Sequence, residues 1–295
     1  MHRPDSILLV GAAHVDRYGR CDGPPVAGGS NPGRVAAMPG GAAFNVASSL
    51  AAFGAQATLH SILGEDAEAG ILREAAAARG VGLRAQVSAA HPTATYTSIV
   101  GPDGALVIAL ADMAVYGALD PGAVAGIGAA RWLLVDANPA PDAIAALLNG
   151  GAQATAAMTV SSAKAGRLRP VLDRIGILFT NRAELAALCG RDADAPVPDL
   201  LHRFRALGGQ RAVVTDGAAD AWTVEGGAVL RHPVPPAPEI TDVTGAGDAL
   251  TAGCLFALMA GRSLAEAVPS GIRAAQAVLA VHGPWRADIA VIAQP

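Results

Sequence analysis

The stretch TDVTGAGDALTAGCLFALMAG, residues 241–261, decides the fold class of this chain. Gly245 and Gly247 flank Ala246, so the backbone there can bend tightly and direct several N–H groups at an anion. The apolar run that follows predicts a helix ending at Gly261. A helix that begins just after Gly-Ala-Gly directs its positive end at this loop, where it would stabilise a phosphate.

Asp248 stands at the start of that helix, where its carboxylate would repel a bound phosphate. The position makes sense if Asp248 faces a second substrate and takes a proton from its hydroxyl, while the loop N–H groups hold the phosphoryl group. Phosphoryl transfer needs this division of labour. Because the residue lies at a helix N-terminus, we expect it to stay ionised near neutral pH. On this stretch alone, an ordinary Asp at a helix start remains an alternative.

Composition describes a compact globular enzyme. The chain has 295 residues, 52% of them apolar and 16% charged, with a net charge of −4 and no run of Lys or Arg. We therefore expect neither a nucleic-acid polymer nor a membrane surface as a partner. Three scattered cysteines without metal-ligand spacing indicate a reduced compartment. The strand-like N-terminus and the lack of a membrane-length apolar run predict a cytoplasmic protein.

Strand and helix patterns alternate along most of the chain, which predicts an α/β fold with a parallel sheet and right-handed crossovers. No repeat or long linker divides the chain, so we expect one domain over residues 1–295. The expected strands are residues 6–11, 132–136, 156–161, 176–180 and 212–215, with a hairpin at 221–230; the expected helices are 41–53, 67–79, 140–148, 182–188, 196–207 and 272–281.

Two segments lack this alternation. Residues 17–39 are rich in Gly, Pro, Ser and Asn, and a polar stretch of this length inside a compact domain is usually functional. Residues 93–112 contain an alternating, β-branched run, a Gly-Pro-Asp-Gly turn and a second apolar run, which together predict a β-hairpin.

The motif DVTGAGDALTAG resembles the C-terminal motif of the ribokinase-like (PfkB) family of carbohydrate and nucleoside kinases. GGAAFNVA at residues 40–47 and GED at residues 64–66 resemble the N-terminal half of the family pattern. Two motifs in the family's order, roughly two hundred residues apart, are far more specific than either alone. The resemblance covers essentially the whole chain and implies a three-layer α/β/α fold with a mostly parallel central sheet. It also implies a small β-sheet lid, formed by about residues 17–39 and 93–112.

The resemblance implies an ATP- and Mg²⁺-dependent kinase. Asp248 matches the family's catalytic base, and Gly245, Ala246 and Gly247 match its anion hole for the transferred phosphoryl group. Asp242 stands where several members bind a monovalent cation, so K⁺ is a further expected ligand.

Asn181 and Glu184 fit the family's Asn-x-x-Glu motif, associated with magnesium and phosphate placement. Glu184 would act mainly through water, since Mg²⁺ keeps much of its hydration shell. Without the family, the same pair is a helix N-cap and its capping-box partner, and both interpretations can hold. Thr215 and Gly217 match a nucleotide contact of the family, although Asp216 stands where a hydrophobic residue is usual.

One departure from the family pattern concerns Met158-Thr159, where many relatives have Asp-Pro. Any phosphate or magnesium role of that aspartate is absent here, or is supplied by Asp136 or Glu184. The departure leaves open a catalytically silent, nucleoside-sensing protein, although the intact Gly-Ala-Gly-Asp sequence argues against it.

Asp16, Gly41 and Asn45 match the positions that hold sugar hydroxyls in the family. Carboxylate and amide groups bind a vicinal diol and penalise analogues that lack it. An ordinary polar residue in the first turn of a helix is the alternative for Asn45.

The lid segments and one loop resemble those of pseudouridine kinases: SNPGR at residues 30–34, ADM at 111–113 and VSSAK at 160–164. Ser30, Asn31 and Asp112 would bind the polar edges of a uracil-like base, and Lys164 matches a family lysine. The resemblance thus implies phosphorylation of the 5′-hydroxyl of pseudouridine. A ribose- or fructose-type sugar kinase and another nucleoside kinase remain alternatives. Lid strands of the family often pair across dimers, so we also expect a homodimer through the lid.

Overall fold

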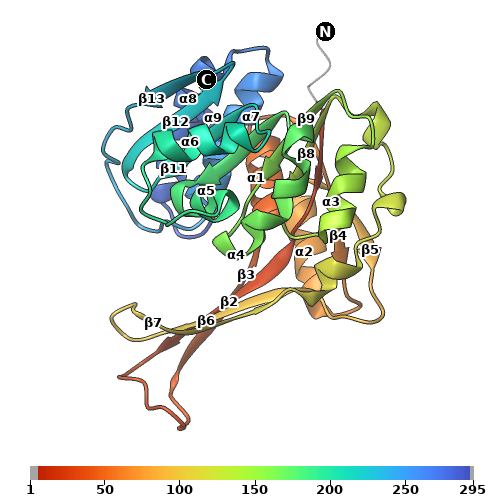
Figure 1. Ribbon diagram of the computed structural model, residues 1–295. Helices are drawn as coiled ribbons and strands as arrows, with labels where there is room; N and C mark the ends of the chain where they lie inside the picture. The colour runs from red at the N-terminus through yellow and green to blue at the C-terminus, as the bar shows by residue number, and fades with distance from the viewer. Residues whose placement is uncertain (1–5, 293–295) are drawn as a thin grey trace.

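A nine-stranded sheet forms the centre of the computed structural model, which describes residues 6–292. The strand order is β13-β12-β11-β10-β9-β8-β1-β4-β5; strands from β11 to β5 pair in parallel, while β12 and β13 pair antiparallel (Figure 1). The strands are β1 (Ser6–Val10), β4 (Gln56–Leu63), β5 (Gly82–Val87), β8 (Trp132–Asp136), β9 (Ala154–Met158), β10 (Ile177–Asn181), β11 (Ala212–Asp216), β12 (Ala219–Glu225) and β13 (Ala228–His232).

Helices cover both faces of this sheet, so its parallel strands are buried on both sides. In β1, Ile7 and Leu9 belong to one core, and Leu8 and Val10 belong to the other. The first core packs under α1 (Ala42–Ala52), α2 (Ala67–Ala78), α7 (Ala246–Met259) and α8 (Leu264–Leu279), with α9 (Ile289–Ile292) beside α8. The second packs under η1 (Ala114–Ala118), η2 (Pro121–Ala123), η3 (Ile127–Ala129), α3 (Pro141–Leu148), α4 (Ser162–Ala165), η4 (Gly166–Arg174), α5 (Arg182–Cys189) and α6 (Val197–Ala206). The expected three-layer α/β/α architecture is confirmed.

The sequence analysis missed two strands, β4 and β5, at one edge of the sheet. Strand β4 contains His60 and Ser61, whose polar side chains interrupt the apolar pattern of the sequence. Both residues are nevertheless buried in the structure. Helix α8 also begins earlier than expected. Its start is set by a capping box between Ser263 and Glu266, and the helix continues through Pro269.

A second sheet, which we call the lid sheet, extends away from the central sheet (Figure 1). It has the order β3-β2-β6-β7 and contains both segments expected to form a lid. Its strands are β2 (His14–Cys21), β3 (Gly33–Gly40), β6 (Thr95–Val100) and β7 (Leu106–Asp112). Because β2 follows β1 almost directly and β3 leads straight into α1, the base of the lid sheet lies beside the carboxyl ends of the central strands.

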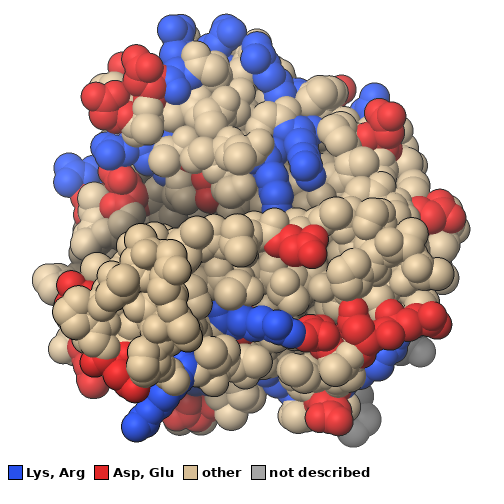
Figure 2. Space-filling view, turned by 90° about the horizontal axis from the view of Figure 1, so that it is seen from below, with Lys and Arg blue, Asp and Glu red and all other residues tan. Residues whose placement is uncertain are grey.

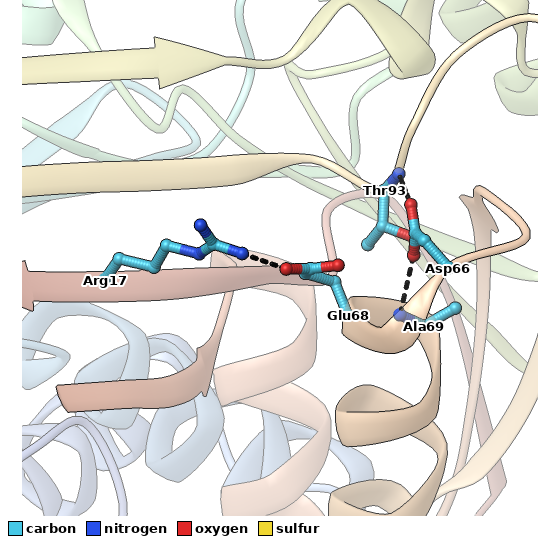
Figure 3. Close-up of polar contacts among 5 residues, drawn as sticks. All are labelled: Arg17, Asp66, Glu68, Ala69 and Thr93. Atoms are coloured by element: carbon cyan, nitrogen blue, oxygen red, sulfur yellow. Dashed lines mark hydrogen bonds and ion pairs between the residues drawn. The ribbon is translucent and has the colours of Figure 1, made fainter. Parts of the chain in front are cut away.

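The start of α2 ties the lid sheet to the rest of the molecule (Figure 3). Asp66 caps α2 by accepting a hydrogen bond from the Ala69 N–H at 3.0 Å. The same carboxylate accepts the Thr93 N–H at 2.7 Å and the Thr93 hydroxyl at 2.6 Å, two residues before β6. Arg17 of β2 forms an ion pair with Glu68 in the first turn of α2. The central strand β2 and the segment that leads into β6 are thereby attached to one helix end.

Candidate active site

The loop before α7 adopts the tight bend expected from its glycines. Gly245 has φ +77°, and a Cβ at this position would lie 2.5 Å from Cα of Pro284. Only glycine fits there. Helix α7 begins at Ala246, so the free N–H groups of its first turn face the space in front of Gly247 and Asp248. A Cβ on Gly247 would meet nothing within 4 Å, which leaves this side of the loop open to a ligand.

The Asp248 side chain is partly buried beside the cavity, and its carboxylate accepts a hydrogen bond from Asn45 Nδ2 at 2.8 Å. Burial raises the pKa of Asp248 to about 7; the Asn45 hydrogen bond opposes the shift, and the carboxylates of Asp136, Glu184 and Asp16 add to it. The expectation that Asp248 stays fully ionised near neutral pH was wrong. Desolvation outweighs the effect of the helix N-terminus, so the group is poised to exchange a proton near pH 7.

Asp16 lies at the base of the lid sheet, on the backbone of the di-glycine. Its Oδ1 is 3.0 Å from His14 Nε2. Its Oδ2 occupies the space that a Cβ of Gly40 would need, at 2.1 Å. Gly41 has φ +105°, and a Cβ there would lie 2.5 Å from the Ala12 carbonyl oxygen. The two glycines therefore let the Asp16 carboxylate and the start of α1 approach each other.

Asn181 and Glu184 form the capping box of α5. The Asn181 side chain accepts the Glu184 N–H at 2.9 Å, and Glu184 Oε2 accepts the Asn181 N–H at 3.5 Å. Both residues also line a cavity of ≈ 220 Å³ together with Gly247, Asp248 and Thr251. Capping does not exclude a ligand role, because only one carboxylate oxygen of Glu184 is used by the cap.

A second, mostly apolar cavity of ≈ 320 Å³ lies between α7, α8 and β12. Thr215 and Gly217, the residues expected to contact the nucleotide, are among those that line it. Thr215, Gly247 and Leu250 also line the smaller cavity, so the two are continuous. At the end of the joined cavities between α7, α8 and β12, the small and apolar side chains would accommodate the flat base of a nucleotide. The loop N–H groups and Asp248 lie at the opposite end.

Asp242 holds the loop before α7 in place. Its oxygens accept the Thr244 N–H at 2.9 Å and the Gly283 N–H at 3.0 Å. Partial burial raises the pKa of Asp242, but these hydrogen bonds outweigh it and lower the pKa overall. Backbone donors occupy both oxygens, so a K⁺ ion beside Asp242 would need carbonyl oxygens for much of its coordination shell.

Lys164 and Asn138 form a polar pair beside the buried Asp136. Lys164 Nζ is 2.5 Å from Asn138 Oδ1, and Asp136 accepts the N–H groups of Ala12 at 2.8 Å and Asn138 at 2.9 Å. Burial lowers the pKa of Lys164, although Asp136 opposes this shift. Burial also disfavours the charged form of Asp136, which for a carboxyl group raises the pKa. Lys164 is thus held at the carboxyl end of β8.

The structure places Ser30 and Asn31 far from this cluster. They lie in the loop that joins β2 to β3, five strand positions beyond Asp16, and a strand rises about 3.4 Å per residue. Asn31 uses its amide within the loop, accepting the Val26 N–H at 2.8 Å and donating to the Gly29 carbonyl at 3.2 Å.

Asp112 lies on the other face of the lid sheet from Asp16. It pairs with Thr95, which pairs with Val15, whereas Asp16 pairs with Tyr96. Residues at equivalent register positions share a face, and successive residues alternate. The lid residues are therefore not brought together with Asp16 and Asp248.

Three polar residues of this region were not predicted from the sequence: His14, Asn138 and Thr180. Asn138 lies just after β8 and Thr180 is the next-to-last residue of β10, so position at a strand end was the available signal for both; His14 begins β2 and contacts Asp16. Thr159 was noted only as a departure from the family pattern, and its contact with Glu184 could be recognised only in three dimensions.

The chain is similar to known proteins over most of its length. A family model described as "pfkB family carbohydrate kinase" matches residues 4–288. The pseudouridine kinase of Escherichia coli K12 is 28% identical over 91% of this chain and 88% of its own length. A carbohydrate kinase structure from Agrobacterium tumefaciens is 33% identical, with a TM-score of 0.85 over 98% of this chain and 97% of that one. Arabidopsis thaliana ribokinase, complexed with ribose and ATP, shares the fold, with a TM-score of 0.85 at 22% identity over 99% of this chain and 100% of that one. Among residues 6–292, no helix is long and apolar enough to cross a membrane.

Proposed function

Because the chain belongs to the pfkB family of carbohydrate kinases, we propose that it transfers a phosphoryl group from ATP to the 5′-hydroxyl of a nucleoside, with pseudouridine as the preferred substrate. One observation carries the proposal. The partly buried Asp248 carboxyl, bound by Asn45, lies at the end of two continuous cavities and beside the residues of the di-glycine motif.

In this reaction Asp248 is the general base. Its pKa of about 7 matches the pH at which the proton must be accepted. Asp248 takes the proton of the 5′-hydroxyl as the oxygen forms a bond to the γ-phosphorus, and ADP leaves with the electrons of the broken P–O bond. The N–H groups at the start of α7 stabilise the charge on the transferred group, because they are oriented before the reaction begins.

The protein offers few side-chain ligands for magnesium at this site. Within residues 6–292, no group of three or more His, Cys, Asp and Glu side chains encloses a metal position. Glu184 lines the cavity beside Asp248, so it would hold the ion through water while phosphates supply other ligands. When bound, Mg²⁺ neutralises charge that develops on the phosphates.

The nucleoside would lie between the lid sheet and the carboxyl ends of β1, β8 and β9. Asp16 and Asn45 would bind ribose hydroxyls, while Lys164 and Asn138 offer a donor and an acceptor to the edge of a base. The likeness to pseudouridine kinase over most of the chain supports this substrate. For Ser30 and Asn31 to contact a base, either the lid sheet moves or the loop comes from a second subunit.

A homodimer through the lid sheet is part of the proposal. Exposed apolar side chains concentrate there: Val35 is 75%, Leu110 65%, Leu106 61% and Ile108 54% exposed. Figure 2 shows broad uncharged areas on this side of the molecule, separated by an acidic group near the centre and by basic and acidic side chains above and below it. Such a surface is typical of an interface between subunits.

The test is ATP consumption by the purified protein with pseudouridine, uridine, cytidine, adenosine, ribose or fructose, in the presence of Mg²⁺ and K⁺. We expect turnover with pseudouridine and loss of turnover in Asp248→Asn. Preference for ribose or fructose would support a sugar kinase instead, which the likeness to the Agrobacterium carbohydrate kinase favours. Binding of nucleoside without ATP consumption would instead indicate a silent, nucleoside-sensing protein.

A further inference from the structure

The carboxyl end of β9 continues into a strained turn. The Ser161 N–H donates to the Thr159 carbonyl oxygen at 2.7 Å, so Val160 is the central residue of a three-residue turn. Val160 has φ +57° and is the only non-glycine residue with positive φ in the described chain. A β-branched residue rarely adopts this conformation, which persists only where surrounding contacts enforce it.

The turn fixes Thr159 behind the smaller cavity. Thr159 is fully buried and does not line the cavity, whereas Val160 and Glu184 do. Its N–H donates to the Phe179 carbonyl oxygen at 3.3 Å. Its hydroxyl contacts Glu184 Oε2 and lies 2.9 Å from the Thr180 hydroxyl. A carboxylate only accepts, so the Thr159 hydroxyl hydrogen is directed at Glu184.

These contacts restrict how the Glu184 carboxylate can turn. Oε2 accepts from the Thr159 hydroxyl and from the Asn181 N–H, and these two donors come from different strands. No hydrogen bond to Oε1 is found within residues 6–292, so this oxygen is free for a ligand in the cavity. Met158-Thr159 stands where the family resemblance implies Asp-Pro, so Met158 replaces the aspartate and Thr159 the proline.

We propose that Thr159 is a positioning residue for Glu184: its hydroxyl holds one carboxylate oxygen so that the other faces the hydrated magnesium ion of the bound nucleotide. The inference rests on the proposed function. In this proposal the site uses one carboxylate, that of Glu184, where the family pattern implies two acidic groups. The Thr159 hydroxyl holds the Glu184 carboxylate in one orientation. The strained turn at Val160 fixes the Thr159 hydroxyl behind the cavity, in contact with Glu184.

The experiment compares ADP binding by calorimetry with and without Mg²⁺ in three proteins: wild type, Thr159→Val and Thr159→Ser. Valine keeps the shape of the side chain and removes the hydroxyl, whereas serine keeps the hydroxyl. Loss of such an outer partner typically weakens metal binding by about tenfold or more. We therefore expect Thr159→Val to weaken Mg²⁺-dependent ADP binding by about tenfold and to leave metal-free ADP binding unchanged. Thr159→Ser should restore the wild-type result.

Thr223→Val is the matched control, because Thr223 is a buried threonine of β12 whose hydroxyl bonds His232, away from Glu184. It should leave ADP binding unchanged with and without Mg²⁺. Equal loss of metal-free and Mg²⁺-dependent binding in Thr159→Val would overturn the proposal, and so would wild-type binding in that variant. Because the readout is ADP binding, it decides the role of Thr159 even if the substrate panel yields no turnover. Failure of that panel would count against the proposed function alone.

Discussion

Burial raises the pKa of Asp248 to about 7, and this has two consequences that separate a catalytic base from a structural carboxyl. The rate should rise with pH through about 7, because only the ionised form accepts a proton. The folded pKa lies above the unfolded value, so folding stability should fall as pH rises from about 4 toward 7.

We therefore predict that Asp248→Asn abolishes turnover and is more stable than wild type at pH 8. The gain should be at most about 4 kcal/mol, because each pKa unit corresponds to about 1.4 kcal/mol. Urea unfolding at pH 5 and pH 8 measures it, and the difference between the variant and wild type should shrink at the lower pH. Asp199→Asn, at an exposed carboxylate on α6, is the control and should show no such pH dependence. Loss of stability in Asp248→Asn at pH 8 would contradict the assignment.

Val160 allows a second test at the scale of one residue. Val160 and Val234 are both partly buried and pack on the same core, but only Val160 has positive φ. Replacement by glycine relieves backbone strain only at Val160, and such strain is worth about 1–3 kcal/mol. We predict that both substitutions lower the free energy of unfolding. The loss in Val160→Gly should be smaller than the loss in Val234→Gly, by at least about 1 kcal/mol. Equal losses in urea unfolding would mean that the turn is unstrained.

At this scale the sequence predicted kinds of residue better than their partners. Gly245, Gly247, Asn45 and Asp248 were all selected from motifs as candidate site residues. The contact between Asn45 and Asp248 was not predicted, because the two are 203 residues apart and nothing local encodes their hydrogen bond. The direction of the Asp248 pKa shift was also missed, since it depends on how completely other elements bury the carboxyl.

At the scale of elements, the attachment of the lid sheet to α2 combines two contacts of unequal strength. Asp66 caps the helix and holds both polar groups of Thr93, and these hydrogen bonds overcome partial burial to lower the pKa of Asp66. The ion pair between Arg17 and Glu68 is more exposed, and ion pairs of that kind contribute about 0–1 kcal/mol.

We predict that Asp66→Ala lowers the free energy of unfolding by about 1–2 kcal/mol, the usual value of a helix cap. Arg17→Ala should lower it by less than about 1 kcal/mol. Urea titration at pH 7 compares the two variants. Because the folded pKa of Asp66 is lowered, its contribution should be present above about pH 4 and lost below it. A larger effect of Arg17→Ala would show that the ion pair is the main attachment.

The sequence predicted most elements because strongly apolar strands and alanine-rich helices alternate along it. It failed where a local signal conflicted with burial. Strand β4 buries His60 and Ser61, and α8 continues through Pro269 because its capping box and its packing on α7 outweigh the missing N–H. Strand β5 is a short edge strand whose residues are mostly half exposed, so its pattern is weak.

At the scale of the whole molecule, the outer face of the lid sheet carries an apolar row. Val35 pairs with Gly19, Gly19 with Ile99, and Ile99 with Ile108, so these residues share the face opposite Asp16. A dimer through this row would cover side chains that are otherwise exposed to water.

We predict that Ile108→Glu converts a dimer into a monomer, because it places a charge within the row, on the edge strand β7. Light scattering during gel filtration measures the mass. Val229→Glu, at an exposed valine of β13 on the central sheet, is the matched control and should leave the mass unchanged. A wild-type protein that elutes as a monomer at high concentration would rule out the dimer.

The order of elements along the chain also has a consequence for how the protein is made. All nine strands of the central sheet precede α7 and α8, yet these two helices cover the side of β9 to β12 that carries Met158, Ile177, Phe179 and Val213. While the ribosome is still translating α7, that apolar surface has no cover. The nascent chain should therefore be a substrate for ribosome-associated chaperones late in synthesis, and release of this client should coincide with the emergence of the last helices.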